Sequence, residues 1–309
     1  MTDFGSTQRH PFISLLLLLL IILISAIVFT LLGALTGGLI YGWPEIMLFF
    51  RGDLSNLPLA RLILIFSSVG NFIIPALIFS RLESRNWKDY LKFNSAFLIL
   101  FVLTVVIMLF SAPLLELSME INQRMKLPAF LSNLEDWMRM QEDQMAELTR
   151  QLLTMPTVSS LLVNLLMIAV IPAIGEELIF RGCFQRLFSQ VFSNDHIAIW
   201  VTAIIFSAIH MQFYGFIPRM LLGAMFGYLL IWSNTIWIPI LAHFVNNATA
   251  VVTAYVFQQQ GKSLEQLGQP DKIHTIVYLI SLIGTAVLLL IFYRKSQMIN
   301  NNNNGARLG

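Results

Sequence analysis

The sequence predicts an all-α, polytopic membrane protein with about eight transmembrane helices. The chain has 309 residues, of which 57% are hydrophobic and 12% are charged, and its mean hydropathy is +0.73. A soluble globular protein carries about 25% charged residues, so this composition excludes an ordinary soluble domain. The net charge is only +2, and no basic stripe is interleaved with aromatic residues. We therefore expect no nucleic-acid partner.

The first apolar segment, PFISLLLLLLIILISAIVFTLLGALTGGLIYGW, is too long for the hydrophobic region of a signal peptide. It also lacks a clear small-x-small cleavage site before polar sequence, so we interpret it as an uncleaved first helix. Further spans are expected near residues 59–80, 95–115, 157–180, 196–212, 217–233, 235–257 and 273–293.

Two segments do not resemble membrane spans. Residues 117–155 include NLEDWMRMQEDQMAELTRQL, which mixes charged and apolar residues at helical spacing and is typical of a surface or interfacial helix. A role in gating substrate is the alternative. The tail INNNNNGARLG, from Ile299, predicts a disordered end. The chain thus divides into N-terminal transmembrane helices with an extramembrane helical segment (1–156), a helical core (157–258), and a last span with its tail (259–309).

Basic residues indicate how the chain is oriented. With eight spans, three basic regions fall on the same side as the N-terminus: Arg81, Arg85, Lys88 and Lys92; Arg186; and Arg294 with Lys295. The positive-inside rule makes that side cytoplasmic. We expect an integral protein of a bacterial cytoplasmic membrane with both termini in the cytoplasm and the 117–155 segment outside.

Polar clusters interrupt three consecutive parts of the core. They are Glu176-Glu177-x-x-x-Arg181, Phe206-x-x-x-His210 and His243-x-x-x-Asn247. A charge at the bilayer centre costs about 2.5–3.5 kcal/mol on insertion scales. This cost makes a cluster of ionisable residues inside a membrane a functional hypothesis.

Helix lengths allow the three clusters to meet. A helix running on from Glu176 reaches a polar turn at residues 193–195, and the next helix returns to His210 over about the same distance, roughly 24 Å. After a turn at residues 233–235, His243 lies about 12 Å into the following helix, near mid-membrane. The clusters are therefore expected at a common depth.

Each residue also has a structural reading. Glu177 and Arg181 have the favourable i,i+4 order for a helical ion pair, which leaves Glu176 as the carboxylate available for chemistry. An intramembrane histidine or asparagine often joins helices by hydrogen bonds, and this applies to His210, His243 and Asn247. The combination of all three clusters indicates a site, whereas no single residue does.

Other signals are weaker or absent. Cys183 is the sole cysteine, which excludes an internal disulfide framework, and we interpret it as a small buried thiol. No HExxH, P-loop, GxGxxG or GxSxG motif occurs.

EExxxR, FxxxH and HxxxN, together with the flanking GEELIFRG, LAHFVNN and GAMFGYL, resemble the CAAX-protease and bacteriocin-processing (CPBP, or Abi) family of intramembrane proteases. This family includes the type II CAAX prenyl endopeptidases. The resemblance covers about residues 162–256 and makes 157–258 the catalytic core. It implies hydrolysis of a peptide bond within the membrane, with Glu176 as the catalytic glutamate and Glu177 as its partner acid. The remaining motif residues are Arg181, His210, His243 and Asn247.

Two mechanisms use these residues. In the first, Glu176 is the general base for a water shared with His210, and His243 and Asn247 donate to the oxyanion. In the second, Glu176, His210 and His243 bind a catalytic Zn²⁺ with water in the fourth position. The residues are the same, so the metal stays undetermined.

We expect a membrane-associated or prenyl-like protein substrate in contact with the lipid bilayer. Two other classes stay open. A non-enzymatic membrane scaffold or bacteriocin-immunity-type protein would retain the residues without cleavage. A proton-coupled transporter would also use Glu and His at mid-membrane, although no inverted repeat of broken helices is visible.

Overall fold

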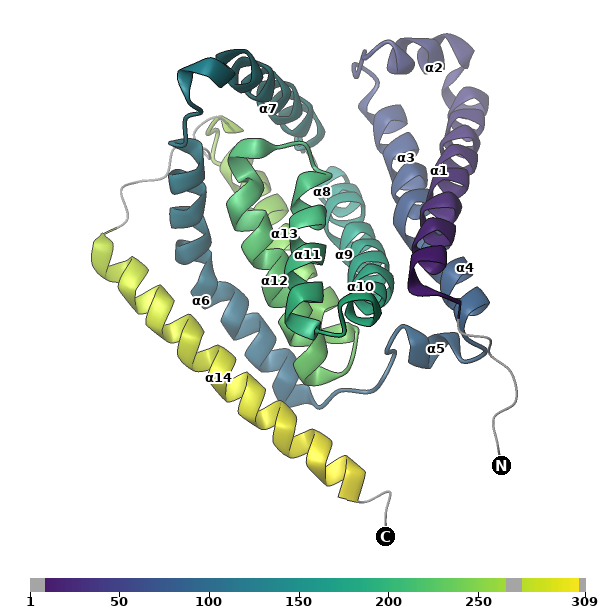
Figure 1. Cartoon of the computed structure of the whole chain (residues 1–309). Coiled ribbons are helices and arrows are strands. Elements are labelled where there is room, and N and C mark those ends of the chain that lie inside the picture. Colours follow the sequence, from purple (N-terminus) through teal and green to yellow (C-terminus); the bar gives the residue numbers. More distant parts are fainter. Residues whose placement is uncertain (1–8, 265–273, 306–309) are drawn as a thin grey trace.

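The computed structural model describes residues 9–264 and 274–305, and the regular elements within them are helices (Figure 1). Seven helices are long and apolar enough to cross a membrane, and one shorter apolar helix accompanies them. The protein is therefore an all-α polytopic membrane protein, and its number of apolar helices is close to the eight expected.

The N-terminal part is an antiparallel helical pair. Its elements are α1 (Pro11–Tyr41), α2 (Trp43–Phe50), α3 (Leu57–Ser68), the π-helical segment η1 (Val69–Ile73), α4 (Ile74–Glu83) and the short α5 (Trp87–Tyr90). Gly70 lets the pair approach closely, because a Cβ atom there would lie 2.3 Å from Cβ of Phe29. α3, η1 and α4 form one membrane-length helix, longer than the 59–80 span expected.

The core consists of further antiparallel passes. They are α6 (Leu98–Gln123); the unbroken helix of α8 (Val158–Asn164), η3 (Leu165–Val170), α9 (Ile171–Glu177), η4 (Leu178–Phe184) and α10 (Gln185–Phe192); α11 (Asp195–Ala208); η5 (Phe213–Gly215) with α12 (Phe216–Ser233); α13 (Trp237–Gln259); and α14 (Thr275–Gly305). Figure 1 shows α9, α11, α12 and α13 together, with α6 and α14 along another face.

The turns that set the depth of the site fall where the sequence predicts them. Ser193 takes a left-handed conformation (φ 49°) after α10, and the Asn194 side chain accepts hydrogen bonds from the amides of His196 and Ile197 to start α11. Asn234 is left-handed (φ 54°) and ends α12. Asparagine tolerates this conformation better than most residues, so the polar turns are encoded locally.

α11 is shorter than its expected span. It has 14 residues and ends at Ala208, a length of about 21 Å at 1.5 Å per residue. The hydrocarbon core of a bilayer is about 30 Å thick. His210 consequently lies in a turn just beyond the helix, not within it.

The 117–155 segment is divided differently from the expectation. Residues 117–123 complete the membrane-length helix α6, because apolar residues such as Met119 and Ile121 continue it. The short η2 (Ala129–Leu131) and the amphipathic α7 (Ser132–Leu152) follow. In Figure 1, α7 lies across one end of the core.

The last helix also differs from the expectation. α14 continues to Gly305, into the asparagine-rich stretch that the sequence predicts to be disordered. Adding residues to an existing helix is easier than nucleating one, so a poor helix former can extend it. The final residues, 306–309, lie outside the described part.

Candidate active site

The buried ion pair predicted from the i,i+4 spacing is present. Arg181 Nη1 donates to Glu177 Oε1 at 2.8 Å, and both side chains are fully buried. Arg181 Nη2 donates to the carbonyl of Gly223 on α12 at 3.0 Å, and its guanidinium lies over the ring of Phe206. Glu177 and Arg181 thus join the α9–η4 helix to α11 and α12.

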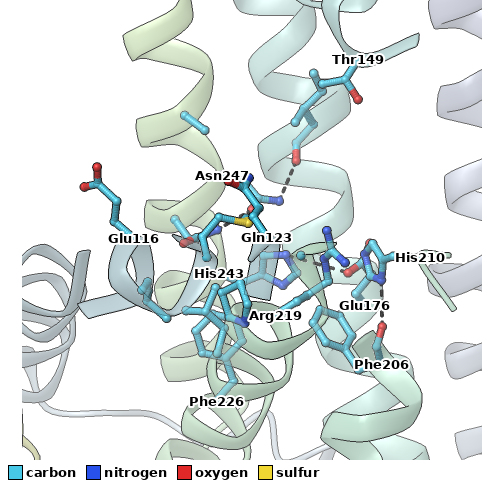
Figure 2. Close-up of a pocket in the computed structure, with 18 of the residues that line it drawn as sticks. Glu116, Gln123, Thr149, Glu176, Phe206, His210, Arg219, Phe226, His243 and Asn247 are labelled. Carbon is cyan, nitrogen blue, oxygen red and sulfur yellow. Dashed lines mark hydrogen bonds and ion pairs between the residues drawn. The ribbon is translucent and has the colours of Figure 1, made fainter. Parts of the chain in front are cut away.

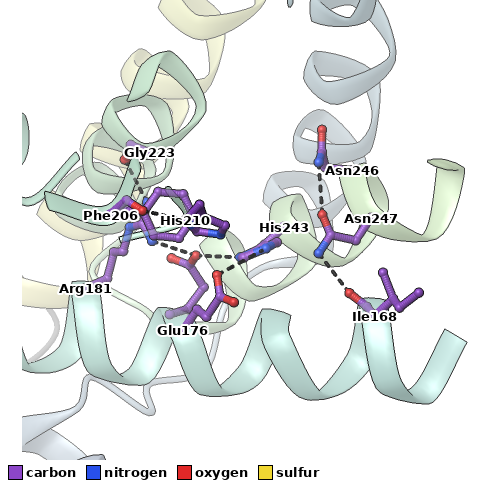
Figure 3. A network of polar contacts seen from close by, with 10 residues as sticks. Ile168, Glu176, Arg181, Phe206, His210, Gly223, His243, Asn246 and Asn247 are labelled. Carbon is purple, nitrogen blue, oxygen red and sulfur yellow. Dashed lines mark hydrogen bonds and ion pairs between the residues drawn. The ribbon is translucent and has the colours of Figure 1, made fainter. Parts of the chain in front are cut away.

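Glu177 has a second partner that the sequence does not reveal. Its Oε1 lies 2.8 Å from Nδ1 of His243 on α13 (Figure 3). An ionised carboxylate can only accept, so the hydrogen of the His243 ring is on Nδ1. The ring also stacks on Phe226, with centroids 5.4 Å apart. Glu177 and Phe226 therefore fix the orientation of His243.

Glu176 points to the other side of that ring. Its Oε2 lies 3.9 Å from Nε2 of His243. This separation is too long for a hydrogen bond, and the Glu176 side chain, although buried, contributes to the wall of a cavity. Of the two adjacent glutamates, Glu177 is engaged by Arg181 and His243, and Glu176 faces open space.

His210 approaches the same cavity from the turn after α11. Its Nδ1 lies 2.8 Å from the carbonyl oxygen of Phe206. A carbonyl can only accept, so Nδ1 carries the hydrogen here too, and Nε2 is the ring nitrogen left for other partners. The FxxxH spacing is thus a local contact that fixes the tautomer.

Asn247 makes a helix-joining hydrogen bond of the kind its structural reading allows, with a partner that the sequence did not identify. Its Nδ2 donates to the carbonyl of Ile168 at 2.9 Å, and its Oδ1 accepts from Asn246. In an α-helix the Ile168 carbonyl would accept from residue 172, but Pro172 has no N–H. Asn247 supplies the missing donor and joins α13 to the helix that carries Glu176. Its second amide hydrogen is left for another acceptor.

These residues surround a cavity of about 800 Å³ (Figure 2). Glu176, His210, His243 and Asn247 line it, whereas Glu177 and Arg181 are absent from its lining and orient groups that are present. α6, α7, η3 and α12 complete the wall. The convergence predicted from helix lengths is therefore observed for all three clusters.

Sequence reasoning missed three charged residues in the lining, namely Glu116 and Glu120 on α6 and Arg219 on α12. The sequence signal that revealed Glu176 and Glu177, a charge within an apolar segment, was also available here. Arg219 is a charge inside the apolar stretch FIPRMLLGAMFGYL, and a charge within such a stretch is a signal for a role.

The geometry was also tested against the zinc alternative. Nδ1 of both histidines is engaged by an acceptor and Nε2 is left open, as is usual for metal-binding imidazoles. Within the described ranges, however, no three His, Cys, Asp or Glu side chains are grouped so that they could hold a metal ion. Glu176, His210 and His243 do not form a His₂Glu site in this arrangement.

Cys183 is fully buried. It packs in a cluster with Leu178, Phe180 and Leu187. Its surroundings fit the small buried thiol predicted from the sequence.

Comparison with known proteins agrees with this geometry. Residues 158–249 match the family model described as type II CAAX prenyl endopeptidase Rce1-like. A curated relative, "Uncharacterized protein YpbD" of Bacillus subtilis (strain 168), is 26% identical over 89 residues, which is 28% of this chain and 42% of that relative. The aligned segment thus spans less than half of the relative. No solved structure gives a significant match.

The apolar helices and the family match together support an integral membrane protein whose core is similar to a protease family. The matched region contains Glu176, Glu177, Arg181, His210, His243 and Asn247. The match over residues 158–249 supports the resemblance to the CPBP family of intramembrane proteases.

Proposed function

We propose that this protein is an intramembrane endopeptidase that hydrolyses a peptide bond of a membrane-associated substrate. The observation that carries the proposal is the position of Glu176. Its carboxylate opens into a cavity within the membrane-spanning core, 3.9 Å from Nε2 of an imidazole that another carboxylate holds in place. A carboxylate beside an oriented imidazole is a suitable arrangement for activating water.

In the proposed reaction, a water molecule between Glu176 and His243 attacks the peptide carbonyl carbon. Glu176 takes a proton from this water as the C–O bond forms. When the tetrahedral intermediate collapses, the C–N bond breaks and the leaving nitrogen takes that proton from Glu176. The products are a carboxylic acid and an amine.

The tautomer of His243 refines its proposed role. With its hydrogen on Nδ1, the neutral ring cannot donate from Nε2 to an oxyanion. Nε2 instead accepts a hydrogen bond from the second hydrogen of the attacking water, and Glu177 holds the ring in position for this contact. The open Nδ2 hydrogen of Asn247 can donate to the oxyanion. Nε2 of His210 is the alternative acceptor for that second hydrogen.

A second concavity supports a lipidated or otherwise apolar substrate. A groove of about 560 Å³ lies between α1, η1, the α9–α10 helix and α11. Its lining is apolar except for Asn71 and includes Ile179 and Phe180, which come shortly after Glu177 in the same helix. Within a bilayer a prenyl-like group is already out of water, so the groove would hold it by close packing of apolar side chains and not by transfer from water.

The orientation in the membrane follows from the basic loops. The two ends of the described chain lie at the same end of the molecule as α5 (Figure 1), where Arg81, Arg85 and Lys88 also lie. By the positive-inside rule, this end faces the cytoplasm, and α7 covers the outer end of the core. A bacterial cytoplasmic membrane is the location that we propose.

The direct test is Glu176→Ala. We expect loss of cleavage by at least about 10²-fold, because general-base catalysis commonly contributes 10²–10⁴-fold, with insertion and expression unchanged. Comparative membrane proteomics of cells carrying parent or variant measures this and names the substrate through fragments that only the parent produces.

If the Glu176→Ala protein generates the same fragments as the parent, the assignment is wrong. If it rescues a deletion phenotype without any fragment, the protein acts as a scaffold. Metal analysis of the purified protein, with cleavage measured before and after chelation, distinguishes a metallopeptidase from a glutamate-type peptidase.

A further inference from the structure

Arg219 is a cation in the cavity that has no paired anion among the residues the structure describes. It lies in the first turn of α12 and lines the same cavity as Glu176 and His210 (Figure 2). Its Nη2 donates to Oε1 of Gln212 at 2.8 Å, and its Nη1 donates to the Gln212 carbonyl at 3.4 Å. Both acceptors are neutral. In the described part of the chain, no carboxylate lies within ion-pair distance of this guanidinium.

Arg181 provides the internal comparison. Its guanidinium contacts Glu177, a backbone carbonyl and an aromatic ring, and it is absent from the cavity lining. Arg181 is therefore neutralised within the fold. Arg219 is only partly buried and lies in the first turn of its helix, so it is less costly to place in a membrane than Arg181. Among the described residues, however, its hydrogen-bond acceptors are both neutral.

Two acidic residues influence Arg219 electrostatically without contacting it. Glu142 and Glu176 act on it electrostatically at a distance. The Oε2 atom of Glu142 accepts a hydrogen bond from the backbone amide of Tyr214. Glu176 faces His243. A guanidinium has five N–H donors in a planar fork that matches a carboxylate, and the two bonds to Gln212 leave donors open.

The guanidinium is also held in position. Gln212 binds it from the turn between α11 and α12, and a Cβ atom at Gly215 would lie only 3.1 Å from its Nη2. Gly215 therefore leaves space for the group. A cation fixed by neutral ligands at the wall of a reaction cavity is organised to receive an anion from outside the chain.

We propose that Arg219 binds a carboxylate of the substrate and thereby selects which peptide bond reaches Glu176. This inference rests on the proposed peptidase function. The carboxylate is either the α-carboxylate at the end of the substrate chain or the side chain of an Asp or Glu near the cleaved bond. Arg219 is accordingly a specificity residue, and the hydrolysis itself uses Glu176 and His243.

The test uses the full-length protein in liposomes and a library of internally quenched membrane-binding peptides. Each peptide is made with a free C-terminus, with a C-terminal amide, and with its acidic residues changed to Asn or Gln. Hydrogen bonds to charged groups contribute enough that Arg219→Gln should lower kcat/KM about 10- to 100-fold for the peptides that carry the recognised carboxylate. The matching neutral peptides should be cleaved equally by parent and variant.

The three peptide forms distinguish the two sources of the carboxylate. If Arg219→Gln no longer distinguishes the free C-terminus from the C-terminal amide, the recognised group is the α-carboxylate. If it no longer distinguishes the acidic peptides from their Asn or Gln forms, the recognised group is a side chain. Arg51→Gln is the matched control, because Arg51 is exposed after α2 and does not line the cavity. Gly215→Ala keeps the charge but displaces the guanidinium, and it should reduce the same discrimination.

If Arg219→Gln slows all peptide forms by one common factor, Arg219 acts on the reaction and the inference is overturned. If the parent cleaves no peptide, the proposed function fails. The inference about Arg219 is then tested by measuring how tightly the peptides bind. Fluorescent peptides should then bind the Glu176→Ala protein about tenfold more tightly as carboxylates than as amides. Equal binding of both forms, or discrimination that persists in Glu176→Ala/Arg219→Gln, would also overturn it.

Discussion

Arg181 shows how one residue stabilises the site without lining it. Its fully buried guanidinium contacts Glu177, the Gly223 carbonyl and the ring of Phe206. Glu177 in turn orients His243. Removing the arginine would leave a buried carboxylate whose one remaining hydrogen-bond partner among the described residues is an imidazole, and uncompensated buried charges are costly.

We expect Arg181→Met to destabilise the protein by about 3–5 kcal/mol, the usual cost of removing one partner from a buried ion pair. Thermal unfolding in detergent measures the change. The double variant Arg181→Met/Glu177→Gln removes both charges and keeps an acceptor for His243, so it should recover most of the lost stability. A double variant no more stable than Arg181→Met would show that the pair is not what stabilises this region.

At the scale of elements, the helix from Val158 to Phe192 departs from regular α-geometry near its functional residues. π-Helical segments precede and follow α9, and such segments are frequent at functional sites. Pro172 removes one backbone donor, and Asn247 on α13 replaces it at the Ile168 carbonyl. The contact fixes α13, and therefore His243, relative to Glu176.

Asn247→Ala should remove the side-chain donor from the Ile168 carbonyl, at a cost of about 1–3 kcal/mol for a weakened buried acceptor. Pro172→Ala restores an N–H that can donate to that carbonyl when η3 relaxes from π-helical to α-helical geometry. The double variant should therefore be more stable than Asn247→Ala alone, as measured by its melting temperature.

Cleavage assays on these variants separate the two roles of Asn247. If Pro172→Ala rescues both stability and cleavage, Asn247 acts only through helix packing. If stability returns and cleavage does not, its second amide hydrogen acts on the substrate. No gain in stability from the second substitution would contradict the structural role.

At the scale of the whole molecule, antiparallel passes bring both ends of the described chain to one end of the bundle (Figure 1). Seven helices are of membrane length, and the shorter α11 also runs antiparallel to its neighbours. The basic loop of residues 81–92 lies at that end, and α2 and α7 lie at the other.

We expect single-cysteine labelling to reproduce this arrangement. A membrane-impermeant maleimide added outside the cell should label Ser55→Cys and Lys262→Cys. It should label Arg85→Cys only after the membrane is permeabilised. The native Cys183 is fully buried and should stay unlabelled, which the parent protein controls. Labelling of Arg85→Cys in intact cells would reverse the proposed orientation.

The sequence predicted those features of the fold and the site that depend on residues close together in the chain. The apolar runs, the asparagine turns and the Glu177–Arg181 pair depend on residues close in the sequence, and they were predictable. Helix ends were less so, as α6, α11 and α14 show, because a helix continues or stops according to what packs against it.

The sequence by itself determined that this is an all-α membrane protein and that three polar clusters reach one depth, because hydropathy and helical rise act along the chain. Only the tertiary structure decided that Glu177 orients His243, that Asn247 donates to the Ile168 carbonyl near Pro172, and that Arg219 enters the cavity with no paired acid in the described part of the chain. These contacts join residues from different helices, and their distances depend on how the helices pack around one another.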